Sequence, residues 1–157
     1  MADAVKVDRA ALLAEAFEAA TCAHAPYSRF GVGAAVLLVD GRVVRGANFE
    51  NASYGLSLCA ETVALAAVNM AGALRDVVAI GVVGGVISSD GLQGDAAVRP
   101  CGRCRQVLNE AAQMGGRDIE VFCASADGAV VERHLLSDLL PHPFGPADLG
   151  IPSSRSG

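Results

Sequence analysis

The sequence predicts one α/β domain, a three-layer α/β/α sandwich with helices on both faces of a mixed sheet of about five strands. Three observations lead to this fold class. Segments with helical spacing of apolar residues alternate with short runs rich in Val, Ala and Gly along the 157-residue chain. A hairpin signal in the first third of the chain adds antiparallel strands, and a later apolar run is continuous enough for a strand covered on both faces. We expect residues 1–150 to form the domain and residues 151–157 to form a flexible tail.

The first half of the chain contains two helical segments on either side of a hairpin. Ala, Leu and Glu, with apolar residues at helical spacing, predict the first helix. The dipeptide Asp40-Gly41 is the strongest short hairpin signal and separates two β-rich runs. A polar, glycine-containing loop precedes a second helix, which is rich in Ala and Val. The expected elements are a helix over residues 8–23, strands over 30–39 and 42–47, a loop over 48–58 and a helix over 59–70.

The second half continues with a strand, a helix, two strands and a short helix. Pro100 suits the start of the long helix, and Gly115-Gly116 ends it. The connection before this helix, residues 88–99, is rich in Gly, Ser and Asp, and we expect it to be mobile. The expected strands cover residues 77–86, 119–124 and 129–131, and the expected helices cover 101–114 and 135–140.

Composition and charge exclude several classes of function. The chain has 12 Lys and Arg against 17 Asp and Glu, a net charge of −5 with no basic run, so we expect no nucleic-acid partner. It has no stretch of about 18 apolar residues, so we expect no membrane span. No signal peptide is visible in the first residues, and we expect a cytoplasmic protein that acts on a small molecule.

Five cysteines in a cytoplasmic protein indicate a metal site or catalysis rather than disulfides. Three of them lie in the patterns Cys59-Ala60-Glu61 and Pro100-Cys101-Gly102-Arg103-Cys104, and each pattern falls at the start of an expected helix. Cysteines at positions i and i+3 of a helix share one face, and the positive end of the helix dipole favours thiolates. We therefore expect Cys59, Cys101 and Cys104 to hold one Zn²⁺, with the fourth tetrahedral position open for water.

Glu61 is the expected proton carrier of this site. In zinc deaminases a glutamate that is not a ligand takes a proton from the activated water and returns it to the leaving group. The alternative is a structural zinc site, which needs a fourth ligand. The remaining Cys and His residues lack ligand-like spacing and are expected to pack in the core or to lie near turns: Cys22, Cys123, His24, His134 and His142.

Together with these two patterns, further motifs make the sequence resemble the cytidine deaminase family, in its short homotetrameric branch with three zinc cysteines. The resemblance covers nearly the whole chain. It implies the cytidine deaminase fold, one Zn²⁺ per chain, and hydrolysis of cytidine and deoxycytidine to uridine and deoxyuridine in pyrimidine salvage. The further motifs are Pro26-Tyr27-Ser28-Arg29-Phe30, Val32-Gly33-Ala34-Ala35, residues 46–55, Arg105-Gln106, Leu139-Leu140-Pro141 and Phe144-Gly145-Pro146.

The resemblance also implies roles at the substrate site. Phe30 would pack on the pyrimidine ring, while Asn48 and Glu50 would bind the ribose hydroxyls. The Ala60 backbone and Glu61 would read the base edge. Asn and Glu at positions i and i+2 point to one side of an extended segment, which suits a sugar. No cluster of Lys or Arg lies near these two residues, which favours a nucleoside over a nucleotide.

Two aromatic residues carry the expectation of an oligomer. By the same resemblance, Tyr54 and Phe144 would reach the pocket of a neighbouring subunit. The expected assembly is a homotetramer with shared active sites.

The residue after the expected proton carrier departs from the family pattern. Three-cysteine members usually have Arg at this position, where this chain has Thr62. Zn²⁺ with three thiolates carries a charge of −1, and the usual Arg offsets this charge by hydrogen bonding to the thiolates. Here either the helix N-termini contribute more, or Arg103 or Arg105 turns inward. Of the two, we expect an arginine of residues 101–106 to compensate. The loop over residues 88–99 also looks atypical for the family.

Three other functions are weaker interpretations of the same residues. A deaminase of a cytosine-containing antibiotic of the blasticidin type is disfavoured by the intact ribose motif at Asn48 and Glu50. A nucleic-acid editing deaminase needs a basic channel, which the acidic composition does not provide. A zinc-stabilised interaction module without activity would leave Glu61 as a surface residue.

Overall fold

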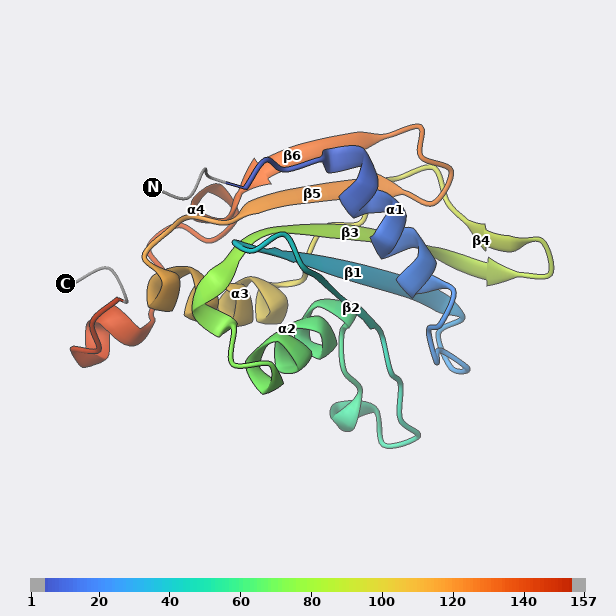
Figure 1. Cartoon of the computed structure of the whole chain (residues 1–157). Coiled ribbons are helices and arrows are strands. Elements are labelled where there is room, and N and C mark those ends of the chain that lie inside the picture. The colour runs from blue at the N-terminus through green and yellow to red at the C-terminus, as the bar shows by residue number, and fades with distance from the viewer. Residues whose placement is uncertain (1–4, 154–157) are drawn as a thin grey trace.

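A mixed six-stranded β-sheet separates two layers of helices in the computed structural model, which describes residues 5–153 (Figure 1). The strand order is β2-β1-β3-β5-β6, and β4 pairs with the end of β3 as a short hairpin. Among these strands β3 and β5 are parallel and the other pairs are antiparallel. The strands are β1 (Phe30–Leu38), β2 (Val43–Ala47), β3 (Val77–Ser88), β4 (Gly91–Gln93), β5 (Glu120–Ser125) and β6 (Val131–Leu135).

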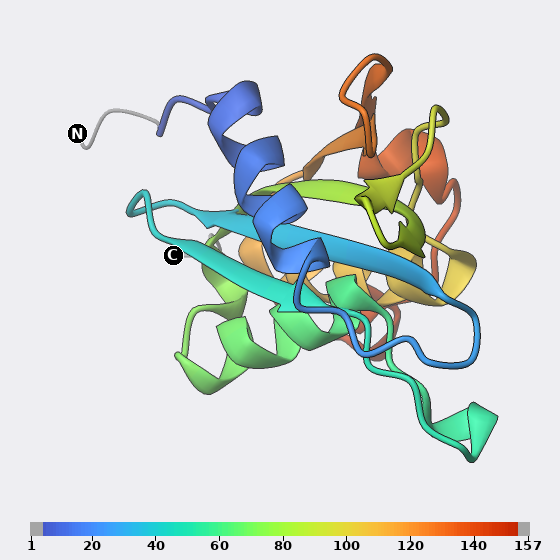
Figure 2. The ribbon, with the colours of Figure 1, turned by 90° about the vertical axis from the view of Figure 1, so that its right-hand side faces the viewer.

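Helices cover both faces of the sheet. Helix α1 (Arg9–Ala20) lies on one face, and α2 (Ala60–Met70) and α3 (Gly102–Gly115) lie on the other (Figure 1, Figure 2). The expected α/β/α sandwich with a mixed sheet is therefore confirmed. The short helix α4 (Leu136–Leu139) follows β6 directly, and 3-10 turns cover Tyr54–Leu56, Leu74–Asp76 and Pro146–Leu149.

The two-residue period of the central strands sends neighbouring side chains into different helical layers. In β1, Ala34 and Val36 join the apolar cluster formed with α2 and α3, whereas Ala35 and Leu37 join the cluster under α1. All four side chains are buried. Because both faces of the sheet are covered, its central strands have continuous apolar runs instead of alternating polar and apolar residues.

Two glycines let helices approach the sheet closely. A Cβ at Gly33 would lie 1.9 Å from the carbonyl oxygen of Ala16 in α1. A Cβ at Gly46 would lie 2.4 Å from the backbone nitrogen of Ala64 in α2. Gly46 thereby sets the distance between β2 and α2, and α2 starts directly after Cys59.

The first helix is shorter than its apolar pattern predicts. It ends at Ala20 instead of residue 23. The Thr21 hydroxyl donates a 2.7 Å hydrogen bond to the carbonyl oxygen of Glu18, and the Cys22 thiol lies 3.9 Å from the same oxygen. Side chains that bond back to the preceding turn in this way compete with continued helix formation.

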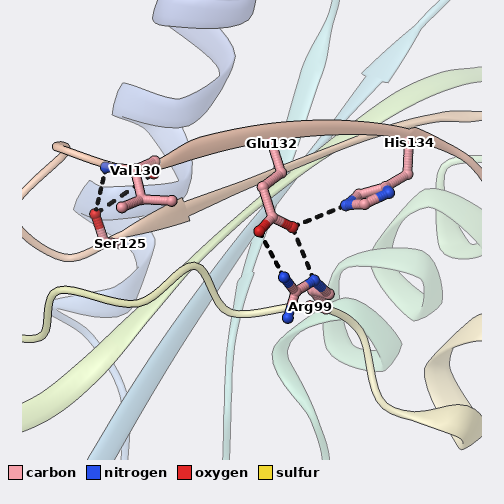
Figure 3. A network of polar contacts seen from close by, with 5 residues as sticks. All are labelled: Arg99, Ser125, Val130, Glu132 and His134. Carbon is pink, nitrogen blue, oxygen red and sulfur yellow. Dashed lines mark hydrogen bonds and ion pairs between the residues drawn. The ribbon is translucent and has the colours of Figure 1, made fainter.

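Two strands differ from the sequence prediction. The connection over residues 88–99, expected to be mobile, contains β4, which pairs with residues 86–88 of β3. The turn between them is at Ser89-Asp90, and Gly91 follows it with φ of 99°. The last strand was expected at residues 129–131 and lies at Val131–Leu135. The Ser125 side chain bonds to the backbone of Val130, so the turn extends to that residue (Figure 3).

The C-terminal residues lie at the edge of the described structure. Residues 151–153 form neither helix nor strand, and residues 154–157 of the expected tail lie outside the described residues. Between residues 5 and 153, no helix has the length and apolar character needed to cross a membrane.

Replacing Gly46→Ala is expected to lower the free energy of unfolding by about 1–3 kcal/mol or more, because backbone atoms of α2 must move away from the added Cβ. Chemical denaturation measures this change. Gly55→Ala is the matched control, because a Cβ there has no atom within 4 Å and its φ is ordinary. Equal stabilities of the two variants would show that α2 does not depend on this contact.

Candidate active site

Three cysteine thiols converge where α2 and α3 begin. Cys59 is the N-cap of α2, Cys101 is the N-cap of α3, and Cys104 lies in the first turn of α3. Their sulfur atoms all lie within 4.8 Å of one another, and the Cys59 and Cys101 sulfurs are 3.8 Å apart. Both N-cap residues have extended backbones, which lets their side chains meet Cys104 in front of the helix ends.

The donor set of this cluster fits Zn²⁺. Three thiol sulfurs at such separations can reach one tetrahedral ion, and three protein ligands are typical of a catalytic rather than a structural zinc site. Two helix N-termini face the cluster, and their partial positive charges favour thiolates. Burial raises the pKa of Cys104, and the nearby Glu61 carboxylate raises it further. A cation bound among the three sulfurs offsets both effects.

Glu61 lies beside the thiols in the first turn of α2. Its side chain is buried, with the residue only 4% exposed, and its Oε2 accepts a 3.4 Å hydrogen bond from the Cys104 thiol. Burial raises the pKa of this carboxyl, because desolvation disfavours the ionised form. A carboxyl with a raised pKa beside the three thiols is suited to general acid and base work.

A cavity of about 280 Å³ opens in front of the cluster. This volume is near the lower end of sites for small molecules. The cavity brings together six of the ten residues expected at the site and adds several that were not expected. Its lining residues are Val32, Asn48, Glu50, Ser57, Leu58, Cys59, Ala60, Glu61, Val98, Arg99 and Cys101.

The polar side chains opposite the thiols are held by backbone atoms. Asn48 accepts a 2.8 Å hydrogen bond from Val32 N–H and donates a 2.9 Å bond to the Phe30 carbonyl. Glu50 Oε2 accepts hydrogen bonds of 2.9 and 3.2 Å from the N–H groups of Tyr27 and Ser28. Hydrogen bonds from Ser28 and from these backbone groups lower the pKa of Glu50, so it remains an anionic acceptor in mildly acidic solution.

Three expected aromatic contacts do not line this cavity. Phe30 stands at the start of β1 and is 37% exposed. Tyr54 and Phe144 are 73% and 64% exposed, and Tyr54 lies against Tyr27 with ring centres 5.5 Å apart. Two amide side chains, of Gln106 and Asn109, hold the Phe144 backbone through its carbonyl. The roles expected for the three aromatic residues remain predictions.

The prediction that Arg103 or Arg105 hydrogen-bonds to the thiols and offsets their negative charge is wrong. Arg103 reaches the Ser57 carbonyl, and Arg105 donates to the carbonyls of Pro100 and Leu139. Among the described residues, no hydrogen bond joins a guanidinium to the three thiols. The hydroxyl of Thr62 lies 3.7 Å from the Cys104 sulfur instead.

Arg99 is the main residue that the sequence analysis missed. It lines the cavity, and it forms a bidentate ion pair with Glu132 of β6, which also contacts His134 (Figure 3). Its position just before Pro100-Cys101 was a signal that it lies close to the metal ligands. Its partner was not predictable, because the two residues are 33 positions apart.

A three-thiol centre of catalytic type, a buried carboxyl and a small-molecule cavity on an α/β/α sandwich define a zinc-dependent hydrolytic enzyme. The model of the cytidine and deoxycytidylate deaminase zinc-binding region matches residues 6–115. The chain belongs to this deaminase family.

Relatives of known name and structure agree with this assignment. A cytidine deaminase of Halalkalibacterium halodurans is 45% identical over 143 residues, which cover 91% of this chain and 98% of the relative. One of Mycobacterium tuberculosis H37Rv is 46% identical over 143 residues, covering 91% and 94%. The crystal structure of cytidine deaminase from Burkholderia pseudomallei matches with a TM-score of 0.75 and 39% identity, over 88% of this chain and all of the other.

The hydrogen bonds to Glu50 are expected to make stability depend on pH in a defined window. A lowered folded pKa contributes stability above the unfolded value of about 4.5, and this contribution is lost as the pH falls through the folded pKa. The difference in unfolding free energy between the wild type and Glu50→Gln should therefore shrink below pH 4.5. Denaturation series between pH 3 and 6 measure it, and a difference that stays constant would contradict the expectation.

Proposed function

We propose that this chain is a zinc-dependent cytidine deaminase, which hydrolyses cytidine and deoxycytidine to uridine and deoxyuridine with release of ammonia. The observation that carries the proposal is a cluster of three thiols with the buried Glu61 carboxyl beside it, of which Cys59, Cys101 and Glu61 line one cavity of ligand size. The curated relatives named above support the same activity, and they do not favour a blasticidin-type antibiotic as substrate.

The chain's own residues account for binding the metal and moving protons. Cys59, Cys101 and Cys104 would hold one Zn²⁺, which supplies a Lewis acid that activates water for attack on C4 of cytosine. Glu61 accepts a proton from the attacking water and passes it to the base. Glu61 then takes the proton of the new C4 hydroxyl and gives it to the amino group, so that the C4–N bond breaks, ammonia leaves and a C4 carbonyl remains. The burial of Glu61 keeps this proton inside the site.

Asn48, Glu50 and Ala60 of the cavity lining would select the nucleoside. Asn48 and Glu50 are fixed by backbone hydrogen bonds and keep further hydrogen-bonding capacity for ribose hydroxyls. The Ala60 backbone lines the cavity next to Glu61, where it would read the base edge. Phe30, whose carbonyl accepts the hydrogen bond from Asn48, would stack on the pyrimidine ring.

A homotetramer with shared active sites is the proposed assembly. The exposure of Tyr54 and Phe144 supports it, because both rings lie on the surface, where a neighbouring subunit could contact them. We place this enzyme in the cytoplasm and in pyrimidine salvage. Its acidic charge supports a small substrate rather than a nucleic acid.

The proposed ligand set predicts about one Zn²⁺ per chain in the purified protein. Cys59→Ser, Cys101→Ser and Cys104→Ser should each lower the zinc content well below this value, as measured by atomic emission spectroscopy. Cys22→Ser is the matched control, since its thiol is exposed at the end of α1 and contacts none of the three. A zinc content unchanged in the three variants would rule out this ligand set.

The proposed reaction predicts ammonia release from cytidine by the zinc-loaded wild type. Glu61→Gln keeps the size of the side chain and removes its proton exchange, so kcat should fall by roughly 10²- to 10⁴-fold. An enzyme-coupled ammonia assay, with zinc content measured on both proteins, makes this comparison. Full activity of the variant would exclude Glu61 as proton carrier, and an inactive but zinc-replete wild type would exclude cytidine as substrate.

A further inference from the structure

The segment between β4 and α3 forms one wall of the cavity and ends at a proposed zinc ligand. Val98 and Arg99 line the cavity, and Cys101 follows after one residue, Pro100. Pro100 is almost fully buried, and its ring fixes φ. Because one residue with a fixed φ separates Arg99 from Cys101, we expect a displacement of the Arg99 backbone to shift Cys101 as well.

The Arg99 side chain ties this wall to the sheet. Its Nε donates a 2.8 Å hydrogen bond to Glu132 Oε2, and its Nη2 donates a 2.5 Å bond to Oε1 (Figure 3). The His134 Nε2 lies 2.9 Å from the same carboxylate, which holds Glu132 from a second side. Bidentate pairs of this kind fix direction as well as distance.

The backbone alone holds the wall weakly. Val98 N–H donates a long hydrogen bond of 3.4 Å to the Ala124 carbonyl of β5. Glu132, by contrast, belongs to a regular strand, whose register pairs it with Cys123 of β5. The ion pair thus connects an irregular segment to a rigid element.

We propose that Arg99 is a positioning residue, whose ion pair with Glu132 holds the cavity wall and places the Cys101 thiol for zinc and substrate binding. The effect on substrate rests on the proposed function, whereas the effect on zinc does not.

The same pair of strands offers a matched control on its opposite face. Arg133 Nε and Glu120 Oε2 form an ion pair of 2.7 Å. The register pairs Arg133 with Phe122, which lies in the cluster under α1, so this pair is on the far side of the sheet from the thiols. The side chains of Arg99 and Glu132 are 50% and 26% exposed, and those of Arg133 and Glu120 are 54% and 29% exposed. Both are thus partly exposed ion pairs, so removing either should lower stability only slightly.

The test compares Arg99→Gln and Glu132→Gln with Arg133→Gln and Glu120→Gln in the zinc-loaded protein. Rates of zinc transfer to a chromogenic chelator and the KM for cytidine are measured beside the thermal midpoint. We expect about three- to tenfold faster zinc release and a similar rise in KM for the first two variants, and changes below about twofold for the control pair. Thermal midpoints should fall only slightly in all four.

Two further variants separate positioning from direct contact with the substrate. The double variant Arg99→Gln/Glu132→Gln should be no worse than either single variant, because both remove one interaction. The exchanged pair Arg99→Glu/Glu132→Arg should recover part of the slow zinc release. The proposal is overturned if zinc release matches that of the controls, or if Arg99→Gln raises KM while Glu132→Gln does not. Because zinc release is measured without substrate, it stays decisive even if cytidine is not turned over.

Discussion

The meeting of two helix N-termini at one point is the constraint on which the rest of the site depends. Cys59 and Cys101 are both N-caps, and the extended backbone of an N-cap lets each thiol project in front of its helix. The helices reach this point because they share one face of the sheet, with the start of α2 set against β2 by the missing side chain of Gly46. Packing over the sheet thus determines the distances within the thiol cluster.

The negative charge of the zinc-loaded thiol cluster would require neighbours that carry positive charge or donate hydrogen bonds. One Zn²⁺ and three thiolates carry −1, and the buried Glu61 adds negative charge when it is ionised. No guanidinium among the described residues hydrogen-bonds to the thiols, so the two helix N-termini supply the positive potential in direct contact with them. A thiolate cannot donate a hydrogen bond, so when Cys104 is deprotonated the contact at 3.7 Å must be donated by the Thr62 hydroxyl. The Cys104 sulfur thus contacts the neutral hydroxyl of Thr62 instead of the arginine that we expected.

The parts of this site that the sequence predicts are those encoded locally. The spacing Cys101-x-x-Cys104 and the start of α3 follow from neighbouring residues, and the alternation of apolar runs indicates the layered fold. The strand β4 and the boundaries of β6 were missed, because they depend on a turn at Ser89-Asp90 and on the side chains of Ser125 and Asp127, which hold the turn before β6. The partner of Arg99 was missed for the same reason. This partner, Glu132, lies 33 residues further along the chain, and its position is fixed only when β6 pairs with β5.

The charges around the cavity also favour an uncharged substrate. Among the described residues that line it, Arg99 is the one cation, and Glu132 occupies two of its donor groups. Glu50 and Glu61 line the same space, and the metal with its three thiolates adds a further negative charge. A 5′-phosphate would therefore be repelled by these negative charges. It would also lose its hydration without gaining a free arginine as partner, because Arg99 is already paired with Glu132. A neutral nucleoside would avoid this cost and would gain the proposed hydrogen bonds of Asn48 and Glu50. The Arg99–Glu132 ion pair thus also leaves a phosphate without a free cation on the cavity lining.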